Sequence, residues 1–191
     1  FIPVAGMRHL SLPDGSQVQL NSKSTLLYPK QFTGKERCVY LVGEANFKVK
    51  PDKKHPFIVK SDDFQVTALG TEFNVSAYPE NQEISTALLS GSVLVEWGNL
   101  TQRTVLQPDE QLTYDKENRQ FRVVHPDMAD VTAWQRGELV FNEMTVEDII
   151  RVLERKYNYT FVYSLNQLKK DRLSFRFKDK APLAAVSYTH L

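Results

Sequence analysis

Apolar and polar residues alternate in short runs along the chain from residue 7 to about residue 124. In one run Val18 and Leu20 alternate with polar neighbours, and in another Phe73 and Val75 do the same. Because successive side chains of a β-strand point to opposite faces, this alternation predicts strands with one buried face. Such runs cover residues 16–21, 44–50, 56–61, 63–69, 71–78, 83–89, 92–97, 110–115 and 120–124. No stretch of useful length in this region has the period of an amphipathic helix.

Turn-forming residues separate these runs at intervals of roughly 8–12 residues. Asp14-Gly15 is a turn signal, since glycine readily takes positive φ. We interpret Gly43 as a turn position and Gly70 as a turn or bulge. Short strands with frequent turns are typical of a sandwich, a barrel or a short solenoid. Residues 1–125 are therefore predicted to form a mainly β domain of sandwich-like or solenoid-like architecture.

The character of the sequence changes near residue 125. Residues 126–137 lack a strand pattern and are interpreted as a linker or a short capping helix. The segments that follow predict a strand at 138–144, a helix at 145–158 and strands at 159–163 and 172–179. Residues 138–191 are thus expected to form a small α+β domain.

The helix at residues 145–158 carries the strongest local signals. Thr145 is a favourable N-cap, and Asp148 three residues later completes a pair that resembles a capping box. Apolar residues then recur at helical spacing, at positions 146, 149, 150, 153 and 157. This pattern predicts a helix with one buried face.

The composition is that of an ordinary globular protein. The chain has 191 residues, of which 41% are hydrophobic, and 24 basic residues face 23 acidic ones, giving a net charge of +1. Binding to a nucleic-acid backbone needs clustered positive charge, so we expect no nucleic-acid partner. No run approaches the roughly 20 apolar residues of a membrane-spanning helix, and because the chain begins with Phe1 we expect a fragment of a longer protein.

Candidate catalytic chemistry is sparse. Cys38 is the only cysteine, which excludes an intramolecular disulfide and a cysteine-based zinc site, and its apolar neighbours suggest a small buried side chain. The four histidines have no metal-ligand spacing, and no phosphate-binding loop or nucleophile motif is present. We interpret Glu44 as a carboxylate that caps a turn. The expectation is a binding or signalling module that is not an enzyme and needs neither cofactor nor metal.

Three motifs then resemble a known family. "LPDGSQVQLN", "GEANFKV" and "LGTEFNV" occur in the order and approximate spacing of the FecR-type transmembrane anti-sigma regulators, over about residues 6–115. The segment "ELVFNEMTVEDIIRVLERKYNYTFVY" with "LSFRF" resembles the C-terminal domain of Bacteroidetes members, which is similar to the STN module. The pairing of the two domains suggests a Bacteroidetes source.

The resemblance implies a signalling role. Such a regulator holds an ECF-type sigma factor through a cytoplasmic part, which this chain does not show, and it crosses the inner membrane once. Its periplasmic part receives a signal from the signalling domain of an outer-membrane TonB-dependent transporter, after which proteolysis releases the sigma factor. This chain would be the periplasmic sensor portion.

The partner is expected to dock on the C-terminal domain, at its sheet edge or beside Trp134. An α+β unit with an open edge can accept a further strand. The candidate contact residues are Trp134, Phe141, Tyr159, Phe161, Val162, Tyr163, Phe175 and Arg176. Two other functions stay open, a carbohydrate- or wall-binding β module and a hydrolase whose site is assembled across loops.

The end of the chain predicts an incomplete domain. "KDKAPLAAV" begins like a second helix, with Pro182 suited to the first helical position, but the pattern stops in the last five residues. We expect residues near 187–191 not to be native sequence. Phe175 and Phe177 would then lack cover, which dimerisation or exchange of elements could supply, or the tail would stay mobile.

Overall fold

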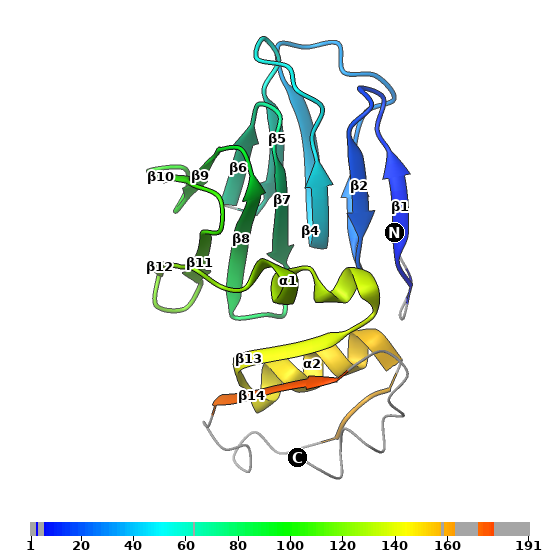
Figure 1. Ribbon diagram of the computed structural model, residues 1–191, viewed down its shortest axis with the longest axis vertical. Helices are drawn as coiled ribbons and strands as arrows, with labels where there is room; N and C mark the ends of the chain where they lie inside the picture. The colour runs from blue at the N-terminus through cyan, green and yellow to red at the C-terminus, as the bar shows by residue number, and fades with distance from the viewer. Residues whose placement is uncertain (1–2, 4–5, 63, 158, 163–171, 178–191) are drawn as a thin grey trace.

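The computed structural model describes residues 3, 6–62, 64–157, 159–162 and 172–177 (Figure 1). Between residues 8 and 124 the chain forms one curled sheet of twelve strands. The strands are β1 (Arg8–Ser11), β2 (Gln17–Leu20), β3 (Thr25–Leu27), β4 (Arg37–Lys48), β5 (Phe57–Ser61), β6 (Phe64–Ala68), β7 (Glu72–Ala77), β8 (Glu83–Ser90), β9 (Val93–Trp97), β10 (Gln102–Leu106), β11 (Gln111–Asp115) and β12 (Gln120–Val124). Each predicted run overlaps a strand, whereas β1, β3 and β10 lie outside the predicted runs. The mainly β fold is confirmed, as a sheet curled into a half-barrel.

The long strand β4 connects the two halves of the curled sheet. Its first half pairs with β3 and, in parallel, with β5, and its second half pairs with β2 and β7. The change of partners falls at Gly43, which has a φ of +106°. A Cβ added at Gly43 would lie 2.4 Å from Ser24 Oγ, so only glycine fits without displacing Ser24. The interpretation of Gly43 as a turn is wrong, because the residue bends a continuous strand from one half of the sheet into the other.

The inner face of the curl holds the main hydrophobic core. Phe47 on β4 lies between the rings of Phe57 and Phe73, with centroids 6.0 and 5.3 Å away. Phe57 belongs to one half of the sheet and Phe73 to the other. All three rings are fully buried. This aromatic contact across the curl contributes strongly to the core, since each buried ring removes a large apolar area from water.

The predicted turn at Asp14-Gly15 is present, with a φ of +87° at Gly15. Asp14 accepts hydrogen bonds from the backbone N–H and the hydroxyl of Ser16, at 3.0 and 2.7 Å. Its Oδ2 also lies 2.6 Å from Nη1 of Arg37, whose side chain is only 4% exposed. Burial alone would raise the pKa of Asp14, but the hydrogen bonds from Ser16 and Arg37 outweigh it and lower that pKa. The "LPDGS" motif therefore builds a buried ion pair that ties the first turn to β4.

The segment after the sheet is partly helical. α1 (Met128–Val131) begins after Asp127, whose side chain accepts from the Ala129 N–H at 2.8 Å, and the 3-10 helix η1 (Ala133–Arg136) follows. This is the region interpreted as a linker or a short capping helix. Figure 1 shows α1 across one end of the sheet, between β7–β8 and the C-terminal unit.

The C-terminal unit comprises β13 (Leu139–Thr145), α2 (Val146–Tyr157) and β14 (Arg172–Phe177). β13 and β14 pair antiparallel, and the apolar face of α2 packs on this pair. The buried core residues are Leu139, Phe141, Ile149 and Leu153. The predicted N-cap is confirmed, since Thr145 Oγ1 accepts from the Asp148 N–H at 3.2 Å and donates to its carboxylate at 2.9 Å.

The strand predicted at residues 159–163 is wrong for the four residues that the structure describes there. Residues 159–162 have no regular secondary structure, and Tyr163 lies outside the described residues. The Phe161 N–H donates to the side chain of Glu154 at 2.9 Å, so a helix carboxylate satisfies it instead of a neighbouring strand. Phe161 also packs against the core of the C-terminal unit, so tertiary contacts override the β propensity of this segment. The alternation predicted for β14 is confirmed, with Leu173, Phe175 and Phe177 partly buried.

Cys38 also differs from the prediction. It is only half-buried, because it lies on the outer face of β4 while its neighbour Val39 points into the core. Burial nevertheless raises the pKa of the thiol, so the group stays protonated near neutral pH. The predictions made for residues 178–191 fall outside the described residues.

Candidate functional site

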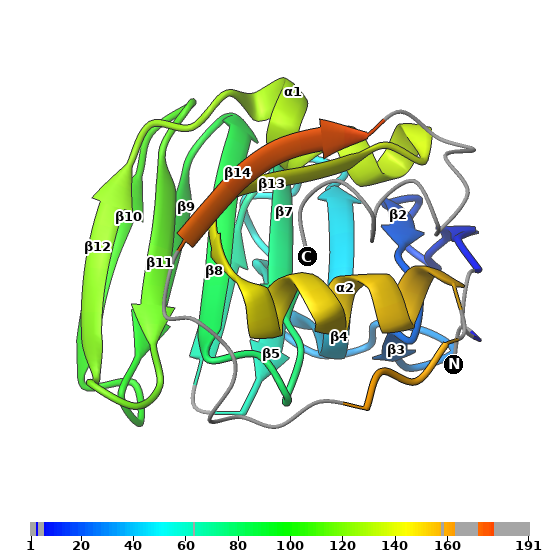
Figure 2. The ribbon, with the colours of Figure 1, turned by 90° about the horizontal axis from the view of Figure 1, so that it is seen from below.

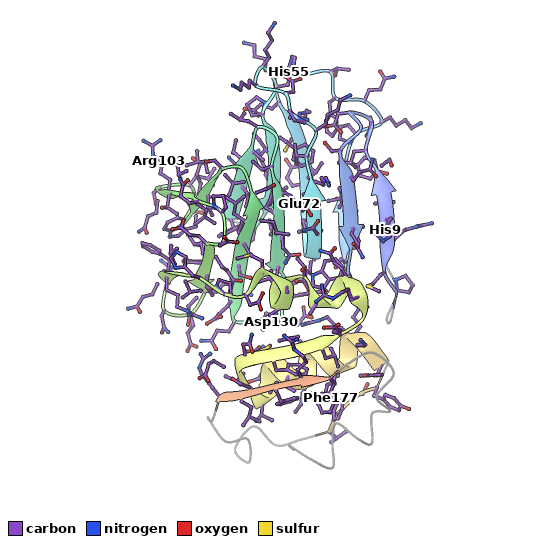
Figure 3. The ribbon with its side chains drawn as sticks, in the orientation of Figure 1. His9, His55, Glu72, Arg103, Asp130 and Phe177 are labelled. Atoms are coloured by element: carbon purple, nitrogen blue, oxygen red, sulfur yellow. The ribbon has the colours of Figure 1, made fainter. Side chains whose placement is uncertain are left out.

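A cleft of about 810 Å³ lies between the outer face of the sheet and the C-terminal unit. Strands β4, β7, β8 and β11 provide one wall, and α1, η1, β13 and α2 provide the other. Viewed from below, α2 and the β13–β14 pair extend across the curled sheet (Figure 2). Asp130 of α1 is labelled at the junction of the two parts in Figure 3. The cleft has the size of a typical small-molecule site.

A row of polar side chains crosses the sheet wall of the cleft. Glu44 on β4 is in register with Ser76 on β7, Ser76 with Ser85 on β8, and Ser85 with Thr113 on β11. Their strand neighbours, among them Ala45 on β4, point into the core. Because side chains alternate along each strand, the four polar groups all point outward toward the C-terminal unit.

Glu44 is the most constrained member of this row. Its carboxylate accepts from Nδ2 of Asn21 at 2.7 Å and from Nδ2 of Asn74 at 3.0 Å, and its own N–H donates to Ser24 Oγ at 2.8 Å. Burial raises the pKa of this carboxyl above its usual range, although the two amides and the charge of Arg155 act in the opposite direction. The interpretation of Glu44 as a turn cap is wrong, because it lies within β4 and faces the cleft.

Trp134 connects η1 to the sheet. Its indole N–H donates to Oδ1 of Asn74 at 3.2 Å, so Asn74 joins Trp134 to Glu44. This predicted contact residue therefore lies in the wall of the cleft, half-buried, where it can meet a ligand as well as hold η1 against β7.

Arg155 forms the second connection between the two parts. Its guanidinium lies 3.8 Å from the ring centroid of Tyr78, and Nη1 donates to Glu80 at 2.7 Å and to Asn81 at 3.1 Å. Tyr78 in turn donates to the Ser22 carbonyl at 2.8 Å. Burial, with the nearby charge of Glu44, raises the pKa of Tyr78, so the phenol stays protonated. The helix α2 is thereby attached to the segment between β7 and β8.

The other predicted contact residues divide by burial. Phe141 is fully buried and its ring centroid lies 4.7 Å from that of Phe175, so both belong to the core of the C-terminal unit. Phe161 is partly buried against the same core. Tyr159 and Val162 are exposed, Val162 to 98%.

Arg176 forms an ion pair with Asp130 of α1 while keeping half of its side chain exposed. It therefore links β14 to the connecting segment. The roles of Asn74, Tyr78 and Arg155 in this cleft were not predicted from the sequence, and the position of Glu44 was predicted wrongly. Alternation could have shown that Asn74 faces outward, but nothing local to the sequence marks Arg155.

No group of three or more His, Cys, Asp or Glu in the described part of the chain could hold a metal ion. No helix of the described residues has both the length and the apolar character needed to cross a membrane. On the sheet wall, the cleft offers the neutral hydroxyls of Ser76, Ser85 and Thr113 beside the Glu44 carboxylate.

Two family models and two solved structures match this chain. The family model described as FecR protein matches residues 2–94, and the model described as FecR, C-terminal matches residues 138–186. A crystal structure assigned as an anti-sigma factor from Parabacteroides distasonis is 32% identical, with a TM-score of 0.92 over 99% of this chain and 90% of that one. A second, also from Parabacteroides distasonis, is 34% identical, with a TM-score of 0.91 over 97% and 85% of the two chains. No curated protein matches the chain.

The two family models match in the order of the two structural units, and the solved relatives share the fold across both. With a relative 32% identical over nearly its whole length, this chain belongs to the FecR family.

Proposed function

We propose that this chain is the periplasmic sensor portion of a membrane-anchored anti-sigma regulator that controls an ECF-type sigma factor. The observation that carries the proposal is the likeness, over nearly the full chain, to solved proteins assigned as anti-sigma factors. The signal is supplied by the signalling domain of an outer-membrane TonB-dependent transporter, and the sigma factor is held by a cytoplasmic part of the regulator.

The transporter domain docks on the C-terminal unit. Support comes from two separate features of this unit, the exposed side chains of Tyr159 and Val162 and a two-stranded sheet. Within the described residues β13 and β14 pair only with each other, so a partner strand could add to this sheet through backbone hydrogen bonds. Phe141 and Phe175 support this surface from the core rather than contacting the partner.

The test is calorimetric titration of the chain with signalling domains of the transporters encoded beside its gene. Val162→Asp should weaken binding at least about tenfold, because a charge would enter the contact surface. Val105→Asp is the matched control, since Val105 is an exposed valine on β10. Binding by none of these domains would rule out the transporter domain as the partner. Equal binding by both variants would rule out the surface around Val162.

A reporter experiment tests the regulatory half of the proposal. In cells that carry the full-length regulator, Val162→Asp should reduce induction of the sigma-dependent promoter by the transporter's substrate, while Val105→Asp should not. Arg176 is a poorer probe, because charge reversal there also breaks the ion pair with Asp130.

A further inference from the structure

Two serine hydroxyls on the sheet wall of the cleft have no part in the proposed signalling role. Ser76 and Ser85 lie side by side on β7 and β8, and both line the cleft. No side chain of the described residues hydrogen-bonds to either hydroxyl. These small side chains leave a trough above the sheet, in which donors and acceptors face open volume.

The charged groups around the trough are already paired with protein groups. Arg122 binds both oxygens of Glu83, at 2.9 and 3.1 Å. Arg155 is engaged by Glu80 and Asn81 as described above. The hydrogen-bonding capacity left on the sheet wall of the cleft is therefore largely that of neutral hydroxyls and of the remaining lone pairs of Glu44.

We propose that the cleft binds a neutral polyhydroxylated molecule, a mono- or disaccharide, along the row Glu44–Ser76–Ser85–Thr113. Hydroxyl groups of the ligand donate to the Glu44 carboxylate, which the amides of Asn21 and Asn74 hold in place. Hydrogen bonds to a desolvated carboxylate are stronger than those between neutral groups. An uncharged ligand suits the site because the charged groups next to the row, Arg122 with Glu83 and Arg155 with Glu80, are already paired.

The dimensions of the row fit such a ligand. It crosses three interstrand steps of about 4.8 Å each, a length that accommodates two linked pyranose rings. Trp134, which also lines the cleft, offers an apolar surface on the opposite wall, where the C–H face of a sugar can pack. A molecule bound here would touch both the sheet and the C-terminal unit, and so would stabilise their docked arrangement. This inference rests on the cleft and not on the transporter partner.

The experiment uses the chain as it is and a panel of uncharged probes, namely glucose, galactose, N-acetylglucosamine, maltose, cellobiose and lactose. Saturation-transfer NMR detects binding, and calorimetry measures it. Ser85→Leu fills the trough and should weaken binding at least about tenfold, whereas Ser90→Leu, at the other end of β8, should not change it. Ser85→Ala, which cannot disturb the sheet, should give a smaller loss in the same direction.

A second pair of variants tests the carboxylate. Glu44→Gln should weaken binding about tenfold, because a charge-assisted hydrogen bond becomes a neutral one. Glu96→Gln is the control, since Glu96 also accepts from a glutamine amide, at 2.9 Å, on the other half of the sheet. The proposal is overturned if no probe binds at about 10 mM, if Ser85→Leu binds as well as the parent, or if glucuronate or glucosamine binds more tightly than glucose.

Discussion

The β domain encloses its own core, whereas the C-terminal unit relies on the β domain for part of its support. In the β domain the rings of Phe47, Phe57 and Phe73 are fully buried inside the curl. In the C-terminal unit Phe141 is fully buried, but its neighbours Phe175 and Phe177 are only partly covered by the described residues. The larger core predicts the higher resistance to local unfolding.

The contacts between the two parts are chiefly polar. Trp134 donates to Asn74, and Arg155 binds Glu80 and packs on Tyr78. Polar interfaces between units of one chain permit relative motion more readily than large apolar ones. The difference indicates that the β domain is the rigid part of the molecule. A signal can alter the arrangement of the two parts most readily at the polar junction between them.

The largest expected effect comes from truncating the shared aromatic core. Phe47→Ala should lower the free energy of unfolding of the β domain by about 4 kcal/mol, from lost burial and a residual cavity. Phe141→Ala should instead release the C-terminal unit while the β domain stays folded. Denaturant unfolding followed by amide exchange separates the two cases. Equal loss of amide protection in the β domain of both variants would show that the β domain does not fold independently of the C-terminal unit.

The second effect concerns the buried ion pair of the first turn. Asp14→Ala should cost about 3 kcal/mol, because Arg37 would be left charged and buried without its carboxylate. The folded-state pKa of Asp14 is lowered, so its stabilisation is present above the unfolded-state pKa and is lost as pH falls through the folded-state pKa. Acid titrations of stability should therefore be shallower in the variant. A parallel pair of curves would exclude this role for Asp14.

A smaller effect is expected at the junction. Arg155→Ala should weaken docking of the C-terminal unit by about 2 kcal/mol, since it removes a charged hydrogen bond and a contact with the Tyr78 ring. Arg151→Ala, one turn earlier on α2, is the matched control, because Arg151 pairs only with Glu147 and Asp148 of the same helix in the described contacts. Faster amide exchange in α2 for the first variant alone would support the connection; equal rates would refute it.

The smallest expected effect is a change in the pH dependence of stability when Glu44 in the cleft is replaced. Burial raises the folded-state pKa of Glu44, so the contribution of this group to stability is fully present below the unfolded-state pKa of about 4.5 and is lost as pH rises through the folded-state pKa. Glu44→Gln should remove this component, so the difference in stability between parent and variant should change between those two pKa values. Thermal unfolding at a series of pH values measures it, and a constant difference would show that Glu44 titrates normally.

Local patterns in the sequence were sufficient for much of the fold. Alternation located most strands, and Thr145 with Asp148 located the start of α2, because each signal depends only on neighbours in the chain. The turn at Asp14-Gly15 follows from the conformational freedom of glycine. The FecR family could also be inferred from the resemblance of three short motifs, in their order and approximate spacing, to that family.

Tertiary structure alone decided the cleft and the path of β4. Alternation tells which residues of a strand share a face, but register between strands decides that Glu44, Ser76, Ser85 and Thr113 form one row. Position 43 within β4 admits only glycine because Ser24, a residue distant in sequence, lies against it. Residues 159–162 form no strand despite their β pattern, since Glu154 binds the Phe161 N–H and the Phe161 side chain packs on the core of the C-terminal unit. Pairing between segments far apart in sequence is set by the packing of the whole chain, and no local pattern encodes it.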